Sequence, residues 1–211
     1  MKIAVSFLKS KYNLIETIDK INNTDVEFIH VDIMDGDFVP NKSFTYEDVN
    51  NVLKTINKKL DIHLMVTNPI DYIIKFKNLK PEYITIHSEI DKNINDLIYL
   101  IKSYGIKVGI AINPKTSTKC IEKYLSIIDN VLIMSVEPGM GGQKFMNSIL
   151  YKIDVLDKLR KENNYNYLIS IDGGINDDTI KYVKNVDYVV SGSYICMSDD
   201  YQKQINSLRM E

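Results

Sequence analysis

The sequence predicts an α/β protein that folds as a single (β/α)8 TIM barrel. Short runs rich in Val and Ile alternate with amphipathic segments, and this unit recurs eight times along the 211 residues. Runs that are apolar throughout are typical of strands buried on both faces, and their alternation with helices predicts parallel strands joined by crossover helices. Eight units favour a closed barrel over the alternative, an open doubly wound sheet, which usually has about five or six strands. Because no linker interrupts the pattern, we expect one domain over residues 1–211.

The first half of the chain supplies four strand–helix units. Leu14, Ile18 and Ile21 recur at the spacing of one helix face, and Gly105 is suited to end the fourth helix. Asn68 and Pro69 are typical of an N-cap followed by the first helical position. The expected strands are residues 3–8, 27–34, 60–66 and 83–87, and the expected helices are residues 12–21, 46–56, a segment that begins at 68–69, and 94–103.

The second half repeats the pattern four more times, with loops that contain proline or glycine after the strands. Ile149, Ile153 and Leu156 mark the inward face of a long amphipathic helix. The expected strands are residues 108–112, 130–136, 167–171 and 188–190, and the expected helices are residues 117–125, 147–162, 177–183 and a last helix that runs to the C-terminus.

Composition and charge exclude several functional classes. The formal net charge is −2, so the chain lacks the basic surface that nucleic-acid binding requires. No apolar run reaches membrane-spanning length and the N-terminus has no signal-peptide pattern, so neither a membrane nor a nucleic acid is an expected partner. Cys120 and Cys196 are far apart and form no C-x-x-C motif, which is typical of a reducing compartment and predicts a cytoplasmic protein.

The strand expected over residues 27–34 carries the first candidate functional residues. Side chains alternate along a strand, so His30, Asp32 and Met34 share one face. Asp35 and Gly36 then introduce a turn. An imidazole and a carboxylate side by side at the end of a strand are suited to bind a metal or to catalyse a reaction.

Two further ligand-type side chains, His63 and Asp172, lie at comparable heights on other strands. The C-terminal ends of barrel strands meet at one face, so we expect both to converge with His30 and Asp32. Each residue alone is more often structural, but four together are difficult to explain as structure because unpaired buried carboxylates are costly. Two imidazoles and two carboxylates suit one divalent metal cation: zinc, iron(II), manganese or cobalt. His87, at the end of the next strand, is expected at the rim of the site or beside the ligands.

Glycine-rich loops follow the last three expected strands and predict a phosphate site. Glycines let backbone N–H groups approach an anion closely, and the loops after the last two strands are the usual phosphate site of such barrels. One Gly-Gly pair is more often a plain turn, but two such loops at one end of the barrel favour phosphate binding. The first loop is long enough to close over a ligand as a lid. The loops are Glu137-Pro138-Gly139-Met140-Gly141-Gly142-Gln143, Asp172-Gly173-Gly174 and Ser191-Gly192-Ser193.

Three methionines, Met34, Met65 and Met134, stand near strand ends. A single methionine is more often ordinary core packing. Because Met34 shares the face of His30 and Asp32, we interpret these side chains as walls that keep the site dry.

Together these segments resemble the ribulose-phosphate 3-epimerase family over essentially the whole chain. Six motifs occur in the same order along the sequence, most of them at strand ends. They are Ile3-Ala4-Val5-Ser6, residues 30–41, residues 60–66, residues 136–145, Ile171-Asp172-Gly173-Gly174-Ile175 and Val190-Ser191-Gly192-Ser193.

The resemblance implies an isomerase that interconverts D-ribulose 5-phosphate and D-xylulose 5-phosphate at C3, a step of the pentose phosphate pathway. It implies one divalent metal held by His30, Asp32, His63 and Asp172, with Asp32 and Asp172 as the catalytic acid–base pair. Ser6 and His63 would contact the sugar. A sugar phosphate is the implied partner, and a homo-oligomer the implied assembly. The other substrate-binding residues that the resemblance implies are Gly139, Met140, Gly141, Gly142, Gly173, Gly174, Gly192 and Ser193.

The chemistry of the residues agrees with this resemblance. Epimerisation next to a carbonyl needs a base that removes a proton from one face and an acid that delivers a proton to the other. Two carboxylates on opposite sides of a flat 2,3-enediolate perform both tasks and exchange roles with direction. A divalent metal stabilises the charge that develops on the oxygens.

Three other functions are compatible with parts of the sequence. The chain departs from the family pattern at residues 9–12, residues 113–115 and Tyr194, so an allulose-6-phosphate 3-epimerase remains the alternative. A decarboxylase with a Lys/Asp array, as in orotidine phosphate decarboxylase, is disfavoured because the ligand face of the second strand carries no lysine. A non-catalytic sugar-phosphate-binding barrel is disfavoured because both Asp32 and Asp172 are present.

Overall fold

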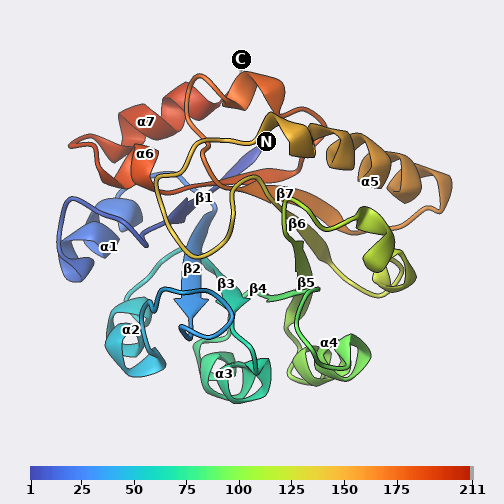
Figure 1. Cartoon of the computed structure of the whole chain (residues 1–211). Helices are drawn as coiled ribbons and strands as arrows, with labels where there is room; N and C mark the ends of the chain where they lie inside the picture. Colours follow the sequence, from blue (N-terminus) through green and yellow to red (C-terminus); the bar gives the residue numbers. More distant parts are fainter. Residues whose placement is uncertain (210–211) are drawn as a thin grey trace.

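Eight parallel strands close into a barrel in the computed structural model, which describes residues 1–209 (Figure 1). The strands pair in chain order and β8 pairs with β1, so the sheet closes on itself. The predicted (β/α)8 TIM barrel is therefore confirmed, and the open-sheet alternative is wrong. The strands are β1 (Lys2–Ser6), β2 (Phe28–Met34), β3 (Lys59–Met65), β4 (Tyr83–His87), β5 (Lys107–Ile112), β6 (Asn130–Met134), β7 (Leu168–Asp172) and β8 (Tyr188–Ser191).

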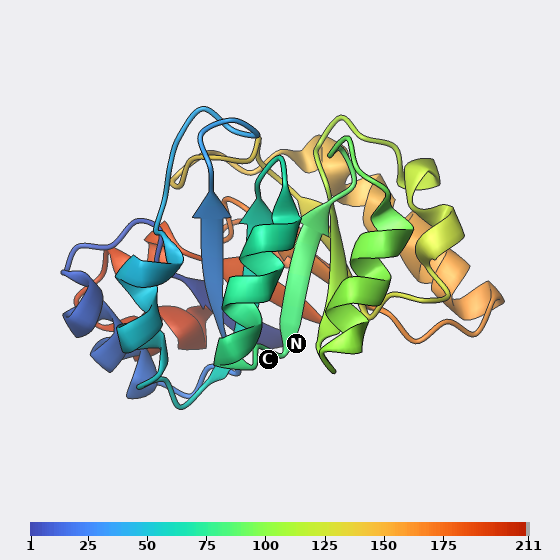
Figure 2. The same cartoon turned by 90° about the horizontal axis from the view of Figure 1, so that it is seen from below.

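Helices surround the barrel and bury their apolar faces against the strands (Figures 1 and 2). The predicted last helix is split in two, and its end, like the end of the predicted domain, falls on residues 210–211, outside the described residues. Within the described part of the chain, no helix has the length and hydropathy needed to cross a membrane. The helices are α1 (Leu14–Asn22), α2 (Tyr46–Leu53), α3 (Pro69–Phe76), α4 (Ile94–Ser103), α5 (Leu150–Glu162), α6 (Ser193–Cys196) and α7 (Tyr201–Leu208).

Two predicted α-helices, over residues 117–125 and 177–183, are wrong. Short 3-10 turns take their place: η2 (Thr118–Cys120) and η3 (Glu122–Tyr124) after β5, and η5 (Ile180–Tyr182) after β7. From Thr118 to Tyr124 the buried side chains are Thr118, Ile121 and Tyr124, which lie three residues apart. That spacing matches the three residues per turn of a 3-10 helix, so these short segments cover the barrel without α-helical geometry. Two further turns, η1 (Lys77–Leu79) and η4 (Asn147–Ile149), adjoin α3 and α5.

Local polar residues set where several helices begin. The side chain of Asn13 accepts a hydrogen bond from the Glu16 amide at the start of α1. Thr45 and Asp48 form a capping box at the start of α2. Asn68 occupies the predicted N-cap position of α3, with Pro69 at the first helical position, but its side chain makes no capping hydrogen bond.

Aromatic side chains fill the barrel interior at the end where the strands begin. The ring of Phe28 lies 5.2 Å from that of Tyr188 and 6.0 Å from that of Tyr83, measured between ring centroids. All three side chains are buried. Because this layer closes one end, a site inside the barrel opens only at the C-terminal ends of the strands, where the long loops gather (Figure 2).

Candidate active site

Strand register places ligand-type side chains at one height inside the barrel. His30 on β2 pairs with Asp61 on β3. Two residues further along the same strands, Asp32 pairs with His63. Neighbouring parallel strands lie roughly 4.8 Å apart, so paired side chains on the inner face are in contact. Asp172, the last residue of β7, reaches the same layer from a strand that is not a neighbour.

The four predicted metal ligands converge around one point. Nε2 of His30 lies 3.3 Å from Oδ1 of Asp32 and 3.9 Å from Oδ2 of Asp172. Nδ1 of His63 lies 3.1 Å and 3.8 Å from the same two oxygens. One donor atom from each residue lies within 4.8 Å of the others. The structure therefore brings together all four residues that the sequence singled out.

Asp61 fixes the orientation of His30. Its Oδ2 lies 2.9 Å from Nδ1 of His30 and accepts a hydrogen bond from the Tyr188 hydroxyl at 3.1 Å. Nε2 of His30 is thereby left facing Asp32 and Asp172. Sequence reasoning gave Asp61 no role. The available signal was its position two residues before His63, which puts both side chains on one face of the strand.

His87 and Glu89 orient His63 in the same way. Nε2 of His63 lies 2.9 Å from Nε2 of His87, and Nδ1 of His87 lies 3.2 Å from Oε2 of Glu89. The Glu89 carboxylate only accepts hydrogen bonds, so His87 carries its proton on Nδ1, and its Nε2 accepts a hydrogen bond from Nε2–H of His63. Nδ1 of His63 is then the atom that faces Asp32. His87 lies beside the ligands, as one of the two expected placements has it, and is fully buried. Glu89 was missed.

The environments of the two aspartates move their pKa values in opposite directions. Burial raises the pKa of Asp172 to about 7, and the nearby carboxylate of Asp32 adds to the rise. Burial also acts to raise the pKa of Asp32, but His30 and His63 outweigh it and hold that pKa below its ordinary value. Burial lowers the pKa of His30, yet the carboxylates of Asp32 and Asp61 outweigh burial and keep it well above its ordinary value.

This donor set fits a divalent cation. Imidazole nitrogens and carboxylate oxygens are ligands of transition metals, and each histidine ring is held by a further hydrogen-bonding residue, as is usual at metal sites. Two carboxylates buried side by side repel each other, and a bound cation removes that repulsion. The buried cluster of His30, Asp32, His63 and Asp172 is thus able to bind a divalent metal.

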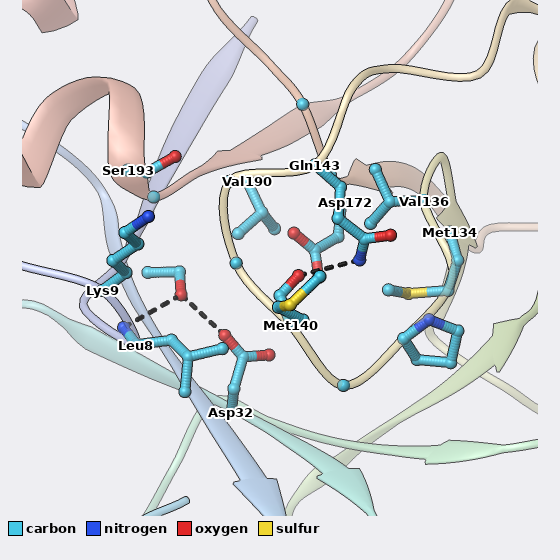
Figure 3. A pocket seen from close by; sticks show the side chains of 18 of the residues that line it. Leu8, Lys9, Asp32, Met134, Val136, Met140, Gln143, Asp172, Val190 and Ser193 are labelled. Carbon is cyan, nitrogen blue, oxygen red and sulfur yellow. Dashed lines mark hydrogen bonds between the residues drawn. The ribbon is translucent and has the colours of Figure 1, made fainter. Parts of the chain in front are cut away.

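A pocket opens over Asp32 and Asp172 at the mouth of the barrel (Figure 3). The hydroxyl of Ser6 donates a hydrogen bond to Oδ2 of Asp32 at 2.6 Å, at the floor of this pocket. The methionines interpreted as site walls all line it: Met34, Met65 and Met134.

Nine of the ten predicted substrate-binding residues line the same pocket. The tenth, His63, is fully buried against Asp32 and does not reach the pocket surface. The nine are Ser6, Gly139, Met140, Gly141, Gly142, Gly173, Gly174, Gly192 and Ser193.

The loop after β6, gold in Figure 1, crosses the mouth of the barrel and contacts two other loops. The side-chain amide of Asn41, in the loop after β2, donates a hydrogen bond to the carbonyl of Gly139 at 2.9 Å. Gly174, in the loop after β7, has φ +65°, and a Cβ there would lie 2.5 Å from the backbone nitrogen of Phe145. Only glycine fits this position, so the backbone itself lines the pocket here.

The sequence of this chain is similar to those of proteins whose family is known. The model of the ribulose-phosphate 3 epimerase family matches residues 2–196. The chain is 41% identical over 212 residues to the ribulose-phosphate 3-epimerase of Helicobacter pylori, a match that covers 99% of this chain and 97% of that protein. It is 34% identical over 213 residues to the ribulose-phosphate 3-epimerase of Bacillus subtilis, covering 99% and 98%.

Solved structures show the same fold at low sequence identity. The 3-hexulose-6-phosphate synthase of Salmonella typhimurium superimposes with a TM-score of 0.68 at 17% identity, covering 99% of this chain and 96% of that one. KGPDC from Streptococcus mutans has a TM-score of 0.69 at 11% identity, with coverage of 98% and 94%. These two matches establish the barrel alone. The sequence matches establish more: they confirm the predicted enzyme class, an isomerase that acts on carbohydrates as an epimerase. The chain belongs to the ribulose-phosphate 3 epimerase family.

Proposed function

We propose that this protein is a metal-dependent D-ribulose 5-phosphate 3-epimerase that interconverts D-ribulose 5-phosphate and D-xylulose 5-phosphate. The observation that carries the proposal is the placement of Asp32 and Asp172. Both carboxylates lie at the floor of one pocket, both belong to the His/Asp cluster, and they come from strands that are not neighbours. A non-catalytic sugar-phosphate-binding protein has no need of two buried carboxylates in this arrangement.

Asp32 and Asp172 act as the acid–base pair in this proposal. The substrate lies between them, so that each carboxylate faces one side of C3. One removes the C3 proton to give the planar 2,3-enediolate, and the other delivers a proton to the opposite face. The roles exchange when the reaction runs in the other direction. The hydroxyl of Ser6 donates a hydrogen bond to Asp32 and so orients that carboxylate. The same hydroxyl contacts the sugar in this proposal.

His30, Asp32, His63 and Asp172 would hold the metal. When bound, a divalent cation offsets the negative charge that develops on the substrate oxygens. Asp61 and His87 keep the two histidine rings in place, which preserves the geometry between reactions. The methionine walls exclude water and so strengthen every electrostatic contact at the floor.

The glycine-rich loops are proposed to receive the substrate phosphate through backbone N–H groups. A sugar phosphate is therefore the proposed small-molecule partner, in the pentose phosphate pathway. The homo-oligomer and the cytoplasmic location stay predictions from the sequence.

Exchange of the C3 proton with solvent tests the proposal. Ribulose 5-phosphate incubated in deuterated water with the protein and a divalent metal is expected to gain deuterium at C3, together with formation of xylulose 5-phosphate. Proton NMR measures both. Absence of exchange with zinc, iron(II), manganese and cobalt each supplied in turn would contradict the enzyme assignment.

A second measurement tests the choice of sugar. Values of kcat/KM for ribulose 5-phosphate and allulose 6-phosphate, taken with the same metal, are expected to favour the pentulose. A higher value for allulose 6-phosphate would replace the proposed substrate with the hexulose and leave the epimerase chemistry intact.

A further inference from the structure

The charges around the pocket are distributed unevenly. Asp32 and Asp172 place two carboxylates at its floor, and Glu137 adds a third in the loop after β6. Glu137 is paired with Lys115, whose amine lies 3.1 Å from its carboxylate. Among the residues of the described chain that line the pocket, Lys9 is the one lysine or arginine.

Lys9 lies where the pocket is bounded by the glycine loops. It stands three residues after the end of β1. Just before it, the backbone amide of Leu8 donates a hydrogen bond to the Ser6 hydroxyl at 3.5 Å. A Cβ placed on Gly142 would lie 3.4 Å from Nζ of Lys9 and 3.9 Å from Oγ of Ser193. Figure 3 shows the Lys9 amine directed towards Ser193 and away from Asp32. The amine thus adjoins two of the three loops proposed to receive the phosphate.

Within residues 1–209, no carboxylate oxygen lies within 4.0 Å of the Lys9 amine, so no ion-pair partner in this part of the chain competes for it. Lys11, two residues further along, contrasts with it because Lys11 is paired with Asp199 outside the pocket. A free ammonium group beside glycine-rich backbone is suited to bind a phosphate dianion, since the N–H groups supply direction and the lysine supplies charge.

We propose that Lys9 binds the phosphate of the substrate and thereby sets both the affinity for phosphorylated sugars and their orientation in the pocket. The proposal rests on the proposed function and deepens it by naming the residue that carries the positive charge. A sugar phosphate that enters has its anionic end attracted to Lys9, at the side of the pocket bounded by the glycine loops. The carbon chain is then directed with its reacting end towards the floor. Lys9 is a binding residue and takes no part in the proton transfer.

Charge removal at Lys9 tests this role. Lys9→Met keeps an unbranched side chain and removes its charge. It is expected to raise KM for ribulose 5-phosphate, and the inhibition constant of inorganic phosphate, about 10-fold each, with kcat within about 2-fold of wild type. Lys9→Arg keeps the charge and is expected to keep both constants within about 3-fold. Lys11→Met is the matched control, because it removes a lysine of the same segment that points elsewhere, and it should leave both constants unchanged.

The same set of variants separates this proposal from the proposed function. An inhibition constant for inorganic phosphate that is unchanged in Lys9→Met would overturn the role of Lys9 even if epimerisation is confirmed. If the wild-type protein does not turn over ribulose 5-phosphate, the proposed function fails, and direct binding of inorganic phosphate, followed by calorimetry, still tests Lys9. Weakened phosphate binding in Lys9→Met, with Lys9→Arg and Lys11→Met both near wild type, would support it.

Discussion

His63 presents Nδ1 to the cluster only while its proton stays on Nε2, and His87 is the acceptor that keeps it there. His87 in turn depends on Glu89, which accepts a hydrogen bond from Nδ1–H of His87 and another from the backbone amide of Asn113 at 2.8 Å. The three side chains form a line from the cluster to the loop after β4. A change at Glu89 is therefore expected to affect the candidate metal site without altering any of its four proposed ligands.

Glu89→Gln is expected to weaken metal binding about 10- to 100-fold, since a neutral amide no longer selects the His87 tautomer that accepts from His63. Calorimetric titration with cobalt(II), together with the visible spectrum of the bound ion, measures the effect. Glu82→Gln is the matched control, because Glu82 lies just before the same strand and pairs with Lys107 at its other end. Equal cobalt affinity in the two variants would contradict the proposed dependence of His63 on His87 and Glu89.

Asp172 is proposed both as a metal ligand and as one half of the acid–base pair, so the effect of its amide replacement on proton transfer is measured at saturating metal. Asp172→Asn is expected to lower the rate of C3 deuterium exchange at least about 1000-fold, because an amide neither accepts nor delivers the proton. Circular dichroism should show an unchanged fold. Asp178→Asn, in the same loop but exposed, serves as the control. Near-normal exchange in Asp172→Asn would remove Asp172 from its proposed role.

At the scale of elements, Asp35 joins the loop after β2 to the loop after β3. Its Oδ2 accepts hydrogen bonds from the amide of Thr67 at 2.6 Å and from the Thr67 hydroxyl at 2.9 Å. Its Oδ1 accepts from the amides of Asp37 and Phe38. The sequence suggested a turn here without any chemistry for the carboxylate. The structure gives it a structural role, because its hydrogen bonds connect the loops after β2 and β3.

Asp35→Ala is expected to lower the free energy of unfolding by about 1–2 kcal/mol, since four hydrogen bonds are lost at a partly exposed site. Burial acts to raise the pKa of Asp35, but the N–H donors of Thr67, Phe38 and Asp37 outweigh it and lower that pKa. A lowered folded-state pKa stabilises the fold above the ordinary Asp pKa, about 3.9, and this contribution disappears as the pH falls through the folded-state pKa. The difference between wild type and variant, measured by urea unfolding, should therefore shrink at low pH. Asp37→Ala, two residues away and exposed, should behave as wild type throughout.

Strand positions were predictable because a strand that is buried on both faces consists of an uninterrupted apolar run, and the length of that run gives the length of the strand. All eight strands begin and end within two residues of the expected positions. The sequence could not show whether the segments after β5 and β7 are α-helices or 3-10 helices. Residues spaced by three, such as Thr118, Ile121 and Tyr124, lie on one face of both kinds of helix. His30 and Asp32 were found by alternation within one strand. Asp61 and Glu89 were missed because their roles depend on contacts between side chains, which one sequence does not display.

At the scale of the whole molecule, the barrel stacks two unlike layers along its axis. An aromatic layer of Phe28, Tyr83 and Tyr188 closes one end, and the His/Asp cluster lies above it. The Tyr188 hydroxyl joins the layers through its hydrogen bond to Asp61. Buried carboxylates of like charge oppose folding unless they are compensated, so a cation bound by the cluster is expected to stabilise the whole barrel.

Removal of the metal is accordingly expected to lower both activity and thermal stability. A ligand that binds only the folded state at about 100 times its Kd adds about 2.7 kcal/mol, which corresponds to about 5–10 °C in Tm for a chain of this size. Chelation should abolish epimerisation and lower Tm by that amount, and added divalent metal should restore both. Asp172→Asn lacks one ligand, so its Tm should rise less on addition of metal than that of Asp178→Asn. A Tm that is the same with and without metal, or full activity after exhaustive chelation, would mean that the cluster is stable by itself and that no cation is required.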